Sequence, residues 1–283
     1  MTAALGTPPV MDLSISLRGK VAFVTGGFRG IGRECVRSLL AHGSRVAFTF
    51  AEGHESQEEA AALVAESPDC LSAHPLDLKS LSSIQSSMEA AMKKWGRIDI
   101  LVNNAAVGSA TVKAFAPDAS TQDSALLAIN ADGALKVCQT FLALMGNDVS
   151  ESPLKIINVS SVGGGVQVFP GFRLADGMSK AAVAFLTKQL AAELTHSKID
   201  VFAICPGATQ TKMFQASTLD SMNDGEREAF VHSLPKHRLI EPSEIASLMV
   251  FLASGYSTPL HGAVIDASMG LGVRPGMVTE KAH

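Results

Sequence analysis

Short apolar runs alternate with longer amphipathic segments along most of the chain. Runs of this kind are typical of strands buried on both faces, and apolar positions three or four residues apart are typical of helices. Their alternation predicts an α/β fold built from βαβ units, with a mostly parallel sheet between two layers of helices. The predicted strands cover residues 21–24, 45–50, 70–74, 98–102, 154–159, 200–204 and 262–266, and the predicted helices cover residues 30–42, 55–66, 79–95, 121–145, 176–195 and 243–253.

Two parts of this pattern carry further information. Leu186, Leu190 and Leu194 recur every four residues and predict the side of their helix that packs on the core. The periodicity weakens between Lys212 and Arg238, where charged residues interrupt it. We interpret residues 209–238 as a mobile segment that covers an active site.

The length and composition favour a single domain. A chain of 283 residues with 47% hydrophobic residues can bury one large core. We expect a flexible N-terminal arm over residues 1–19, one domain over residues 20–272 and a tail over residues 273–283. The arm has neither a basic leader nor a long apolar run, which argues against a signal peptide. No apolar stretch reaches the roughly 20 residues that cross a bilayer, so no membrane partner is expected.

Charge and cysteine content narrow the function classes. The net charge of -4 gives no broad attraction to nucleic acid, so a small-molecule substrate is the expected partner. The four cysteines are scattered, with no Cys-x-x-Cys pair and no histidine at ligand spacing, and predict neither disulfides nor a metal site. These features favour a cytoplasmic protein.

A glycine-rich turn follows the first predicted strand and opens the first predicted helix. Its sequence is Thr25-Gly26-Gly27-Phe28-Arg29-Gly30-Ile31-Gly32. Glycines in this context let backbone N–H groups and the helix N-terminus approach a pyrophosphate closely. The turn therefore predicts a dinucleotide site, with an ordinary tight strand-to-helix turn as the alternative.

Further motifs follow in a fixed order: Asn103-Asn104-Ala105-Ala106, Asn130, Ser160-Ser161, Lys180 and the segment from Pro206 to Thr211. Together with the glycine-rich turn they resemble the short-chain dehydrogenase/reductase (SDR) family. The resemblance implies a single-domain, Rossmann-like, doubly wound parallel sheet. It also implies a homotetramer or dimer joined through the helices at 121–145 and 176–195 and through the C-terminal segment.

The same resemblance implies which residues contact a nicotinamide cofactor. They are Gly26, Phe28, Arg29, Gly30, Ile31, Gly32, Asp77, Leu78, Asn104, Ala105, Lys180, Pro206, Gly207, Thr209 and Thr211. Ala106 replaces the glycine that is usual in the family after Asn-Asn-Ala.

The end of the second strand bears on the choice between NADPH and NAD. Enzymes that use NAD usually place an acid there for the ribose 2'-hydroxyl, and this chain has Thr49-Phe50-Ala51 instead. Arg29 in the glycine turn can face a 2'-phosphate. The sequence therefore favours NADPH over NAD, although Glu52 can alternatively curl back to the ribose.

The chain departs from the family at Asp176. SDR reductases donate a proton from the Tyr of a Tyr-x-x-x-Lys motif, and this chain has Asp176-Gly177-Met178-Ser179-Lys180. The resemblance implies that Lys180, Ser161 and Asn130 complete the catalytic group. Lys180 would hold the nicotinamide ribose, Ser161 would position the substrate and Asn130 would support Lys180 through a water. Ser160 competes with Ser161, and the long interval between Ser161 and Asp176 suggests a remodelled loop at Gly163-Gly164-Gly165.

Aspartate changes the chemistry expected at this position. Its ordinary pKa of about 3.9, against about 10 for tyrosine, makes it an anion that donates no proton at neutral pH. Ketone reduction by the family route should lose the roughly 10² to 10⁴ fold that a general acid contributes. An anion can instead stabilise a cation, by about 4 kcal/mol at 4 Å and an effective dielectric of 20. Reduction of an imine or iminium is therefore predicted.

Two alternatives stay open. One is a carbonyl reductase that takes its proton from a water, from Ser161 or from the cofactor ribose. The other is a cofactor-binding scaffold without redox chemistry, in which Asp176 only caps its helix and pairs with Lys180 four residues later.

Overall fold

A parallel sheet forms the centre of the computed structural model, which describes residues 14–146 and 153–273. Within these residues, seven strands follow the order β3-β2-β1-β4-β5-β6-β7, and every neighbouring pair is parallel. The strands β1, β4 and β5 are buried along their whole length, as expected where helices cover both faces. Their bounds are β1 (Val21–Val24), β2 (Arg45–Ala51), β3 (Leu71–Leu76), β4 (Ile100–Asn103), β5 (Leu154–Val159), β6 (Ile199–Pro206) and β7 (Val264–Ala267).

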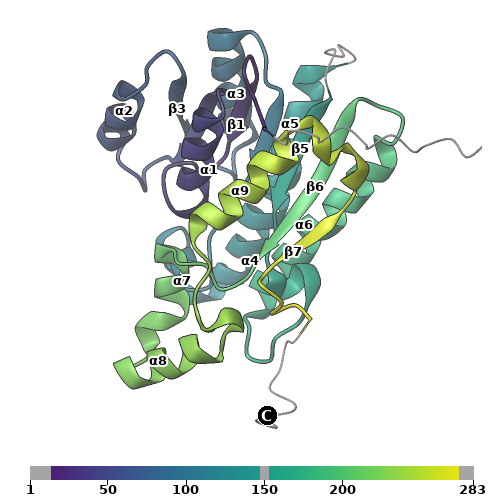
Figure 1. Cartoon of the computed structure of the whole chain (residues 1–283). Helices are drawn as coiled ribbons and strands as arrows, with labels where there is room; N and C mark the ends of the chain where they lie inside the picture. The colour runs from purple at the N-terminus through teal and green to yellow at the C-terminus, as the bar shows by residue number, and fades with distance from the viewer. Residues whose placement is uncertain (1–13, 147–152, 274–283) are drawn as a thin grey trace, which may run out of the picture.

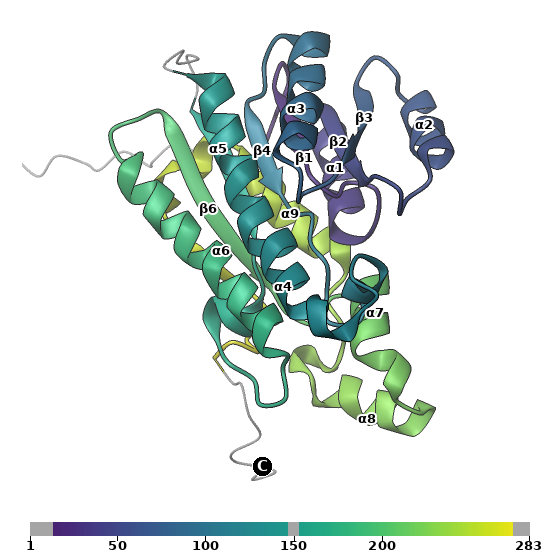
Figure 2. The ribbon, with the colours of Figure 1, turned by 180° about the vertical axis from the view of Figure 1, so that it is seen from behind.

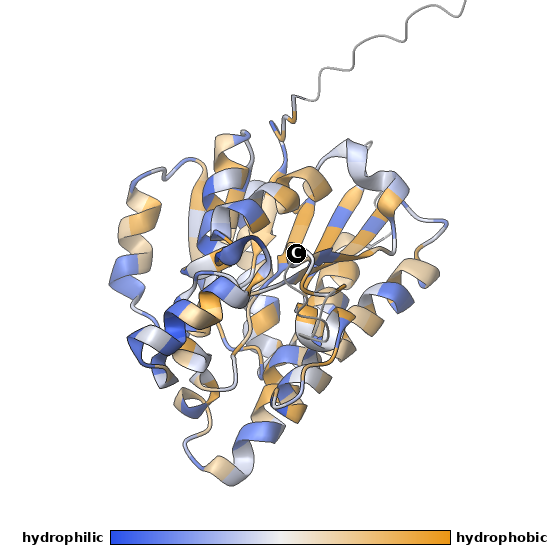
Figure 3. Ribbon diagram, turned by 60° about the horizontal axis from the view of Figure 1, so that its bottom comes forward, coloured by the Kyte–Doolittle hydropathy of each residue, from blue (hydrophilic) through white to orange (hydrophobic). Residues whose placement is uncertain are grey.

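Helices cover the two faces of the sheet separately (Figures 1 and 2). One layer holds α1 (Gly30–Ala41), α2 (Gln57–Ala65) and α9 (Pro242–Ala253), and the other holds α3 (Leu81–Trp95), α4 (Gln122–Leu127), α5 (Gly133–Met145) and α6 (Leu174–Glu193). Each layer encloses its own hydrophobic cluster against the sheet. Figure 3 shows the strands mainly in orange, while the helices mix orange and blue along their length.

Local sequence explains where these helices begin and end. The Ser80 hydroxyl accepts a hydrogen bond from the Ser83 amide at the start of α3, and Gly96 ends that helix at a φ of 73° that suits glycine. In α6, Leu190 is buried in the core beside the partly buried Leu186 and Leu194. The predicted core-facing side of this helix is therefore confirmed.

The predicted fold class is confirmed, and each predicted strand overlaps an observed one. The order of the strands reverses between β1 and β4. In such a sheet the ligand cleft lies outside the carboxyl ends of the strands at this reversal. The glycine-rich turn after β1 therefore lies at the place where a ligand is expected.

Two local predictions need correction, and the mobility of the cover segment stays a prediction. The predicted flexible arm is anchored to the domain at Leu17, which is 2% exposed and whose amide donates to the His42 carbonyl. Residues 1–13 of the arm and residues 274–283 of the predicted tail lie outside the described residues. The long helix predicted at 121–145 is divided by a π-helical turn at Ala128–Asp132. The cover segment contains the helices α7 (Lys212–Ser217) and α8 (Asp224–Ser233).

The structure also bears on membrane-spanning helices, disulfide bonds and metal sites. None of the described helices is long and apolar enough to span a membrane. All four cysteines lie in the described part of the chain and are free. Among the described residues, no three His, Cys, Asp or Glu side chains are grouped to hold a metal ion.

Candidate active site

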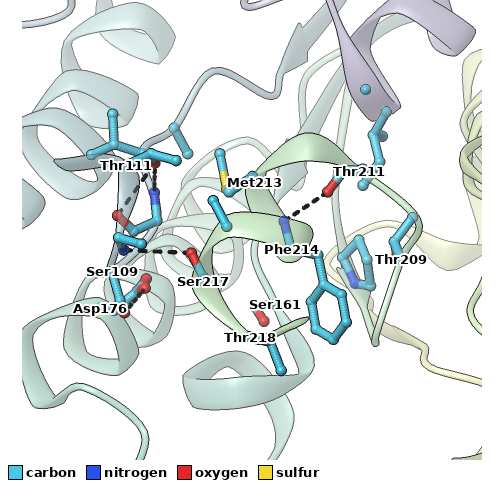
Figure 4. A pocket seen from close by; sticks show the side chains of 18 of the residues that line it. Ser109, Thr111, Ser161, Asp176, Thr209, Thr211, Met213, Phe214, Ser217 and Thr218 are labelled. Carbon is cyan, nitrogen blue, oxygen red and sulfur yellow. Dashed lines mark hydrogen bonds between the residues drawn. The ribbon is translucent and has the colours of Figure 1, made fainter. Parts of the chain in front are cut away.

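A large cleft of about 2320 Å³ lies at the carboxyl ends of the strands. It extends from the glycine-rich turn, past Asp176, to the helices α7 and α8. Apolar side chains from several elements line its outer part, namely Phe169, Phe172, Met213, Phe214, Phe230 and Leu234. Figure 4 shows Met213 and Phe214 on α7 facing the same space as Asp176 and Ser109.

The glycine-rich turn is held in shape by the protein itself. Asn104 Nδ2 donates to the carbonyls of Thr25 and Gly26, at 3.0 and 3.1 Å. A Cβ atom at Gly32 would lie 2.1 Å from the Gly26 oxygen, so no larger residue fits there. The turn thus leaves open space and backbone amides at the N-terminus of α1. This geometry fits the pyrophosphate of a dinucleotide.

An acid that the sequence did not reveal lies at the end of β2. Glu55 forms an ion pair with Arg29, and its second oxygen accepts a hydrogen bond from the Ala51 amide at 2.7 Å. Glu52, the acid considered from sequence, forms no ion pair with Arg29 among the described residues. The strand end itself carries no acid, as the sequence indicated, but Glu55 brings a carboxylate to it from the following segment and holds Arg29.

Most of the predicted cofactor residues lie together along the cleft. Those lining it are Gly26, Arg29, Gly30, Ile31, Gly32, Asp77, Leu78, Asn104, Ala105, Lys180, Pro206, Gly207, Thr209 and Thr211. Phe28 is not among them, because its side chain packs against the core cluster beneath the turn. Asp77 uses one carboxylate oxygen to accept from the Lys79 amide.

Asp176 lies in the first turn of α6 and faces the cleft, although it is only 6% exposed. Its Oδ2 atom accepts a hydrogen bond of 2.7 Å from the Ser109 hydroxyl. The helix begins at Leu174 after Arg173, which makes no side-chain cap. Within the described residues, no ion pair joins Asp176 to Lys180. Asp176 thus lies in the first turn of α6 without a direct ion pair to Lys180, and the alternative in which it only stabilises its helix stays open.

Lys180 lies one turn further along α6 at the wall of the cleft. Its Nζ atom is 3.4 Å from the Val159 carbonyl oxygen. Burial lowers the pKa of Lys180 below its ordinary value, and the nearby charge of Asp176 opposes this shift. The ammonium group is therefore sensitive to what happens at residue 176.

The two serines after β5 have different roles in the structure. The Ser160 hydroxyl is buried and donates to the backbone carbonyl of Lys180 at 2.7 Å. The Ser161 oxygen accepts from the Gly163 amide at 3.2 Å, and Ser161 lines the cleft. Because this bond uses an acceptor lone pair, the Ser161 hydroxyl proton stays available to a substrate.

Asn130 lies behind the wall of the cleft, in the π-helical turn. Its amide exchanges hydrogen bonds of 2.9 Å with the Val107 backbone and donates to the Ser179 hydroxyl at 3.2 Å. Such turns are frequent at functional sites. Here the side chain joins the segment after β4 to α6, on which Asp176 and Lys180 lie.

The glycine-rich loop after Ser161 packs tightly against the start of α6. Gly164 has a φ of +93°, and a Cβ atom there would lie 2.1 Å from the Gly177 carbonyl oxygen. A Cβ atom at Gly165 would lie 2.4 Å from the Ser160 hydroxyl oxygen. This contact fixes the backbone beside Asp176.

Sequence reasoning missed Ser109 and Glu55 as cleft residues. Each contacts its partner across a long interval, Ser109 with Asp176 and Glu55 with Arg29. The one available signal was chemical type, since a buried carboxylate needs a donor nearby.

Comparisons with known sequences agree with this geometry. The model of the enoyl-(acyl carrier protein) reductase family matches residues 26–272. The chain is 32% identical over 260 residues to oxidoreductase UcpA of Escherichia coli, with 90% of this chain and 96% of that protein covered. It is 33% identical over 257 residues to the rhamnolipids biosynthesis 3-oxoacyl-[acyl-carrier-protein] reductase of Pseudomonas aeruginosa, with 90% and 97% covered.

Solved structures show the same architecture with a dinucleotide. The Pseudomonas aeruginosa RhlG/NADP active-site complex superimposes with a TM-score of 0.80 at 30% identity, and the match covers 93% of this chain and 100% of the RhlG chain. The 3-ketoacyl-(acyl-carrier-protein) reductase from Brucella melitensis complexed with NADH has a TM-score of 0.78 at 27% identity, covering 91% and 100%.

Proposed function

The chain belongs to the short-chain dehydrogenase/reductase family and is an oxidoreductase, and from this premise we propose that it is an NADPH-dependent reductase of a small organic imine or iminium. Bound NADPH supplies the hydride for such a reduction. The observation that carries the proposal is Asp176, a carboxylate that faces the cleft where the family has a phenol.

A carboxylate at this position favours a substrate that carries positive charge. Asp176 has little exposed surface, and the Ser109 hydroxyl is the one side-chain donor found for it among the described residues. A buried anion with incomplete hydrogen bonding gains free energy from a nearby cation, by about 4 kcal/mol at 4 Å and an effective dielectric of 20. A protonated imine supplies that cation and needs no further acid when hydride arrives.

The other residues support binding and orientation in this proposal. Lys180 holds the nicotinamide ribose, Ser161 donates its free hydroxyl proton to the substrate, and Asn130 supports the Lys180 region through a water. Burial lowers the pKa of Lys180 and the charge of Asp176 opposes this shift, so the two groups interact electrostatically. Both residues therefore belong to one electrostatic unit.

NADPH is proposed over NAD because Arg29 lies at the mouth of the 2' site. Its guanidinium pairs with Glu55 in the structure, and a 2'-phosphate can compete for the same cation. One relative was solved with NADP and another with NADH. The negative charge of Glu55 therefore opposes binding of the 2'-phosphate of NADPH, and the positive charge of Arg29 favours it.

A second candidate is reduction of a carbonyl group. Two similar proteins are named as 3-oxoacyl or 3-ketoacyl reductases, and Ser161 has a hydroxyl proton to donate. In this alternative Asp176 would have no part in the chemical step.

The experiment compares cyclic iminium salts with ketones of matched size, following loss of the reduced nicotinamide absorbance. We expect turnover of the iminium salts. Hydride transfer discharges the cation, so the charge pair is stronger before transfer than after it. Asp176→Asn should therefore raise KM for iminium by roughly 10² fold and change kcat little.

A matched control is Asp220→Asn, which removes another carboxylate that lines the cleft. It should leave KM for iminium within about twofold of the wild-type value. Ketone turnover that survives Asp176→Asn, with no iminium turnover, would favour the carbonyl reductase. Absence of turnover despite measured NADPH binding would favour the non-redox scaffold.

We also propose that the protein acts as a homo-oligomer in the cytoplasm. The four free thiols favour a reducing compartment. The apolar outer face of α6, formed by Leu174, Met178 and Phe185, supports assembly through that helix.

A further inference from the structure

Ser109 lies between Asp176 and the cover segment, after strand β4. Its hydroxyl donates to Asp176 Oδ2 at 2.7 Å, a normal length for an O–H···O hydrogen bond. The bond occupies one carboxylate oxygen. It leaves Oδ1 as the oxygen that can approach a cationic nitrogen.

The backbone of Ser109 is fixed from one side by Arg173. Arg173 Nη1 donates to the Ser109 carbonyl oxygen at 3.1 Å. The same guanidinium is held by the Asp123 carboxylate, at 2.7 Å, and by the Gln122 side chain, at 3.1 Å. Arg173 thus connects α4, the start of α6 and the backbone at Ser109 through these hydrogen bonds.

The cover segment fixes the same stretch of chain from the other side (Figure 4). The Ala110 amide donates to the Ser217 hydroxyl oxygen on α7 at 3.4 Å. Met213 packs so closely on Gly108 that a Cβ atom there would lie 2.9 Å from Met213 Cγ. Gly108 is held in turn by the Thr111 hydroxyl, which accepts from its amide at 2.8 Å.

We propose that Ser109 is the positioning residue for Asp176. Its hydroxyl orients the Asp176 carboxylate toward a cationic substrate, and Ser109 is itself held between Arg173 and α7. The inference rests on the proposed function of Asp176 and adds the residue that sets its geometry. A hydroxyl that donates to one oxygen keeps the carboxylate in a single rotamer. The same bond supplies a donor to a carboxylate oxygen that has little contact with solvent.

Removal of the hydroxyl should weaken binding of the cation and leave the chemical step largely intact. Ser109→Ala should raise KM for a preformed N-methyl iminium salt about tenfold, with kcat within about twofold, because a hydrogen bond to a charged group contributes about this much. Ser109→Thr, which keeps the hydroxyl, should restore most of the wild-type KM.

A binding measurement separates positioning from turnover. The saturated N-methyl ammonium compound carries the same charge and cannot accept hydride. Its Kd, measured by calorimetry, should rise about tenfold in Ser109→Ala. Ser233→Ala is the matched control, since this hydroxyl also lines the cleft but donates to the Phe230 carbonyl. It should change neither Kd nor KM.

The double variant decides whether Ser109 acts through Asp176. In the Asp176→Asn background, Ser109→Ala should cause no further loss, because the interaction it supports is already gone. Additive losses in the double variant would overturn the inference. It would also be overturned if a folded Ser109→Ala protein kept the wild-type Kd and KM while Asp176→Asn weakened binding. If Asp176→Asn itself leaves Kd and KM unchanged, the proposed function fails and the inference fails with it.

Discussion

Asp176 and Glu55 are both nearly buried carboxylates that face the same cleft, but their hydrogen bonding differs. Glu55 is neutralised by Arg29 and also accepts from the Ala51 amide. Asp176 has the Ser109 hydroxyl as its partner and no cation bonded to it among the described residues. Since a buried charge is stable only with adequate partners, Asp176 is the group that a cationic ligand would complete.

Glu55 leads to a prediction about cofactor choice. Glu55→Gln should release Arg29 from its ion pair and remove a negative charge beside the 2' site. The ratio of kcat/KM for NADPH to that for NADH should rise about tenfold, which corresponds to about 1.4 kcal/mol. Steady-state kinetics with both cofactors measures this ratio.

Glu52→Gln is the control for that measurement, because Glu52 lines the same end of the cleft without pairing with Arg29. It should leave the cofactor ratio nearly unchanged. A fall of the ratio in Glu55→Gln would contradict the assignment of Glu55 as the residue that opposes NADPH.

Elements built from strong local patterns were predictable, and those built from close packing were not. The strands and the helices around the sheet follow apolar periodicity. The helix α8 has a weak apolar pattern, although Asn223 and Glu226 form a capping box that the sequence already contained. The long interval between Ser161 and Asp176 pointed to an altered loop at Gly163-Gly164-Gly165, but the contact of Gly164 with Gly177 could not be predicted from it.

That loop yields a prediction about stability. Gly164→Ala introduces a Cβ at a φ of +93° and 2.1 Å from the Gly177 oxygen. The free energy of unfolding should fall by about 3 kcal/mol, from backbone strain together with the displaced helix start. Urea denaturation measures the loss. Activity should fall as well, because Asp176 precedes Gly177.

Gly171→Ala provides the matched control for this loss. Gly171 also has a positive φ, of +79°, but no atom lies within 4 Å of a Cβ placed there. Its substitution should cost about 1 kcal/mol from backbone strain alone. Equal losses in the free energy of unfolding of the two variants would show that the contact with Gly177 does not contribute to stability.

At the scale of the whole molecule, α6 has two apolar sides. One side faces the core, and on the other Leu174, Met178 and Phe185 are 83%, 58% and 67% exposed. Their spacing of four and seven residues places them on one face of the helix. An exposed apolar face of this kind is typical of a contact surface, which agrees with assembly through α6.

Phe185→Glu should shift the protein from an oligomer toward the monomer, because it buries a charge in the expected interface. Light scattering coupled to gel filtration at micromolar concentration measures the mass. Leu81→Glu, which alters an exposed leucine on α3 that is 46% exposed, should leave the mass unchanged. A monomeric wild-type protein would contradict the proposed assembly.

The hydrogen bonds from Asn104 to the turn after β1 also affect how the protein handles its cofactor over many turnovers. Since hydrogen bonds within the protein brace the binding loop, little conformational entropy should be lost on association. Oxidised and reduced nucleotide can then replace one another without local refolding. Exchange between catalytic cycles should therefore be governed by departure of the nucleotide and not by reassembly of its loop.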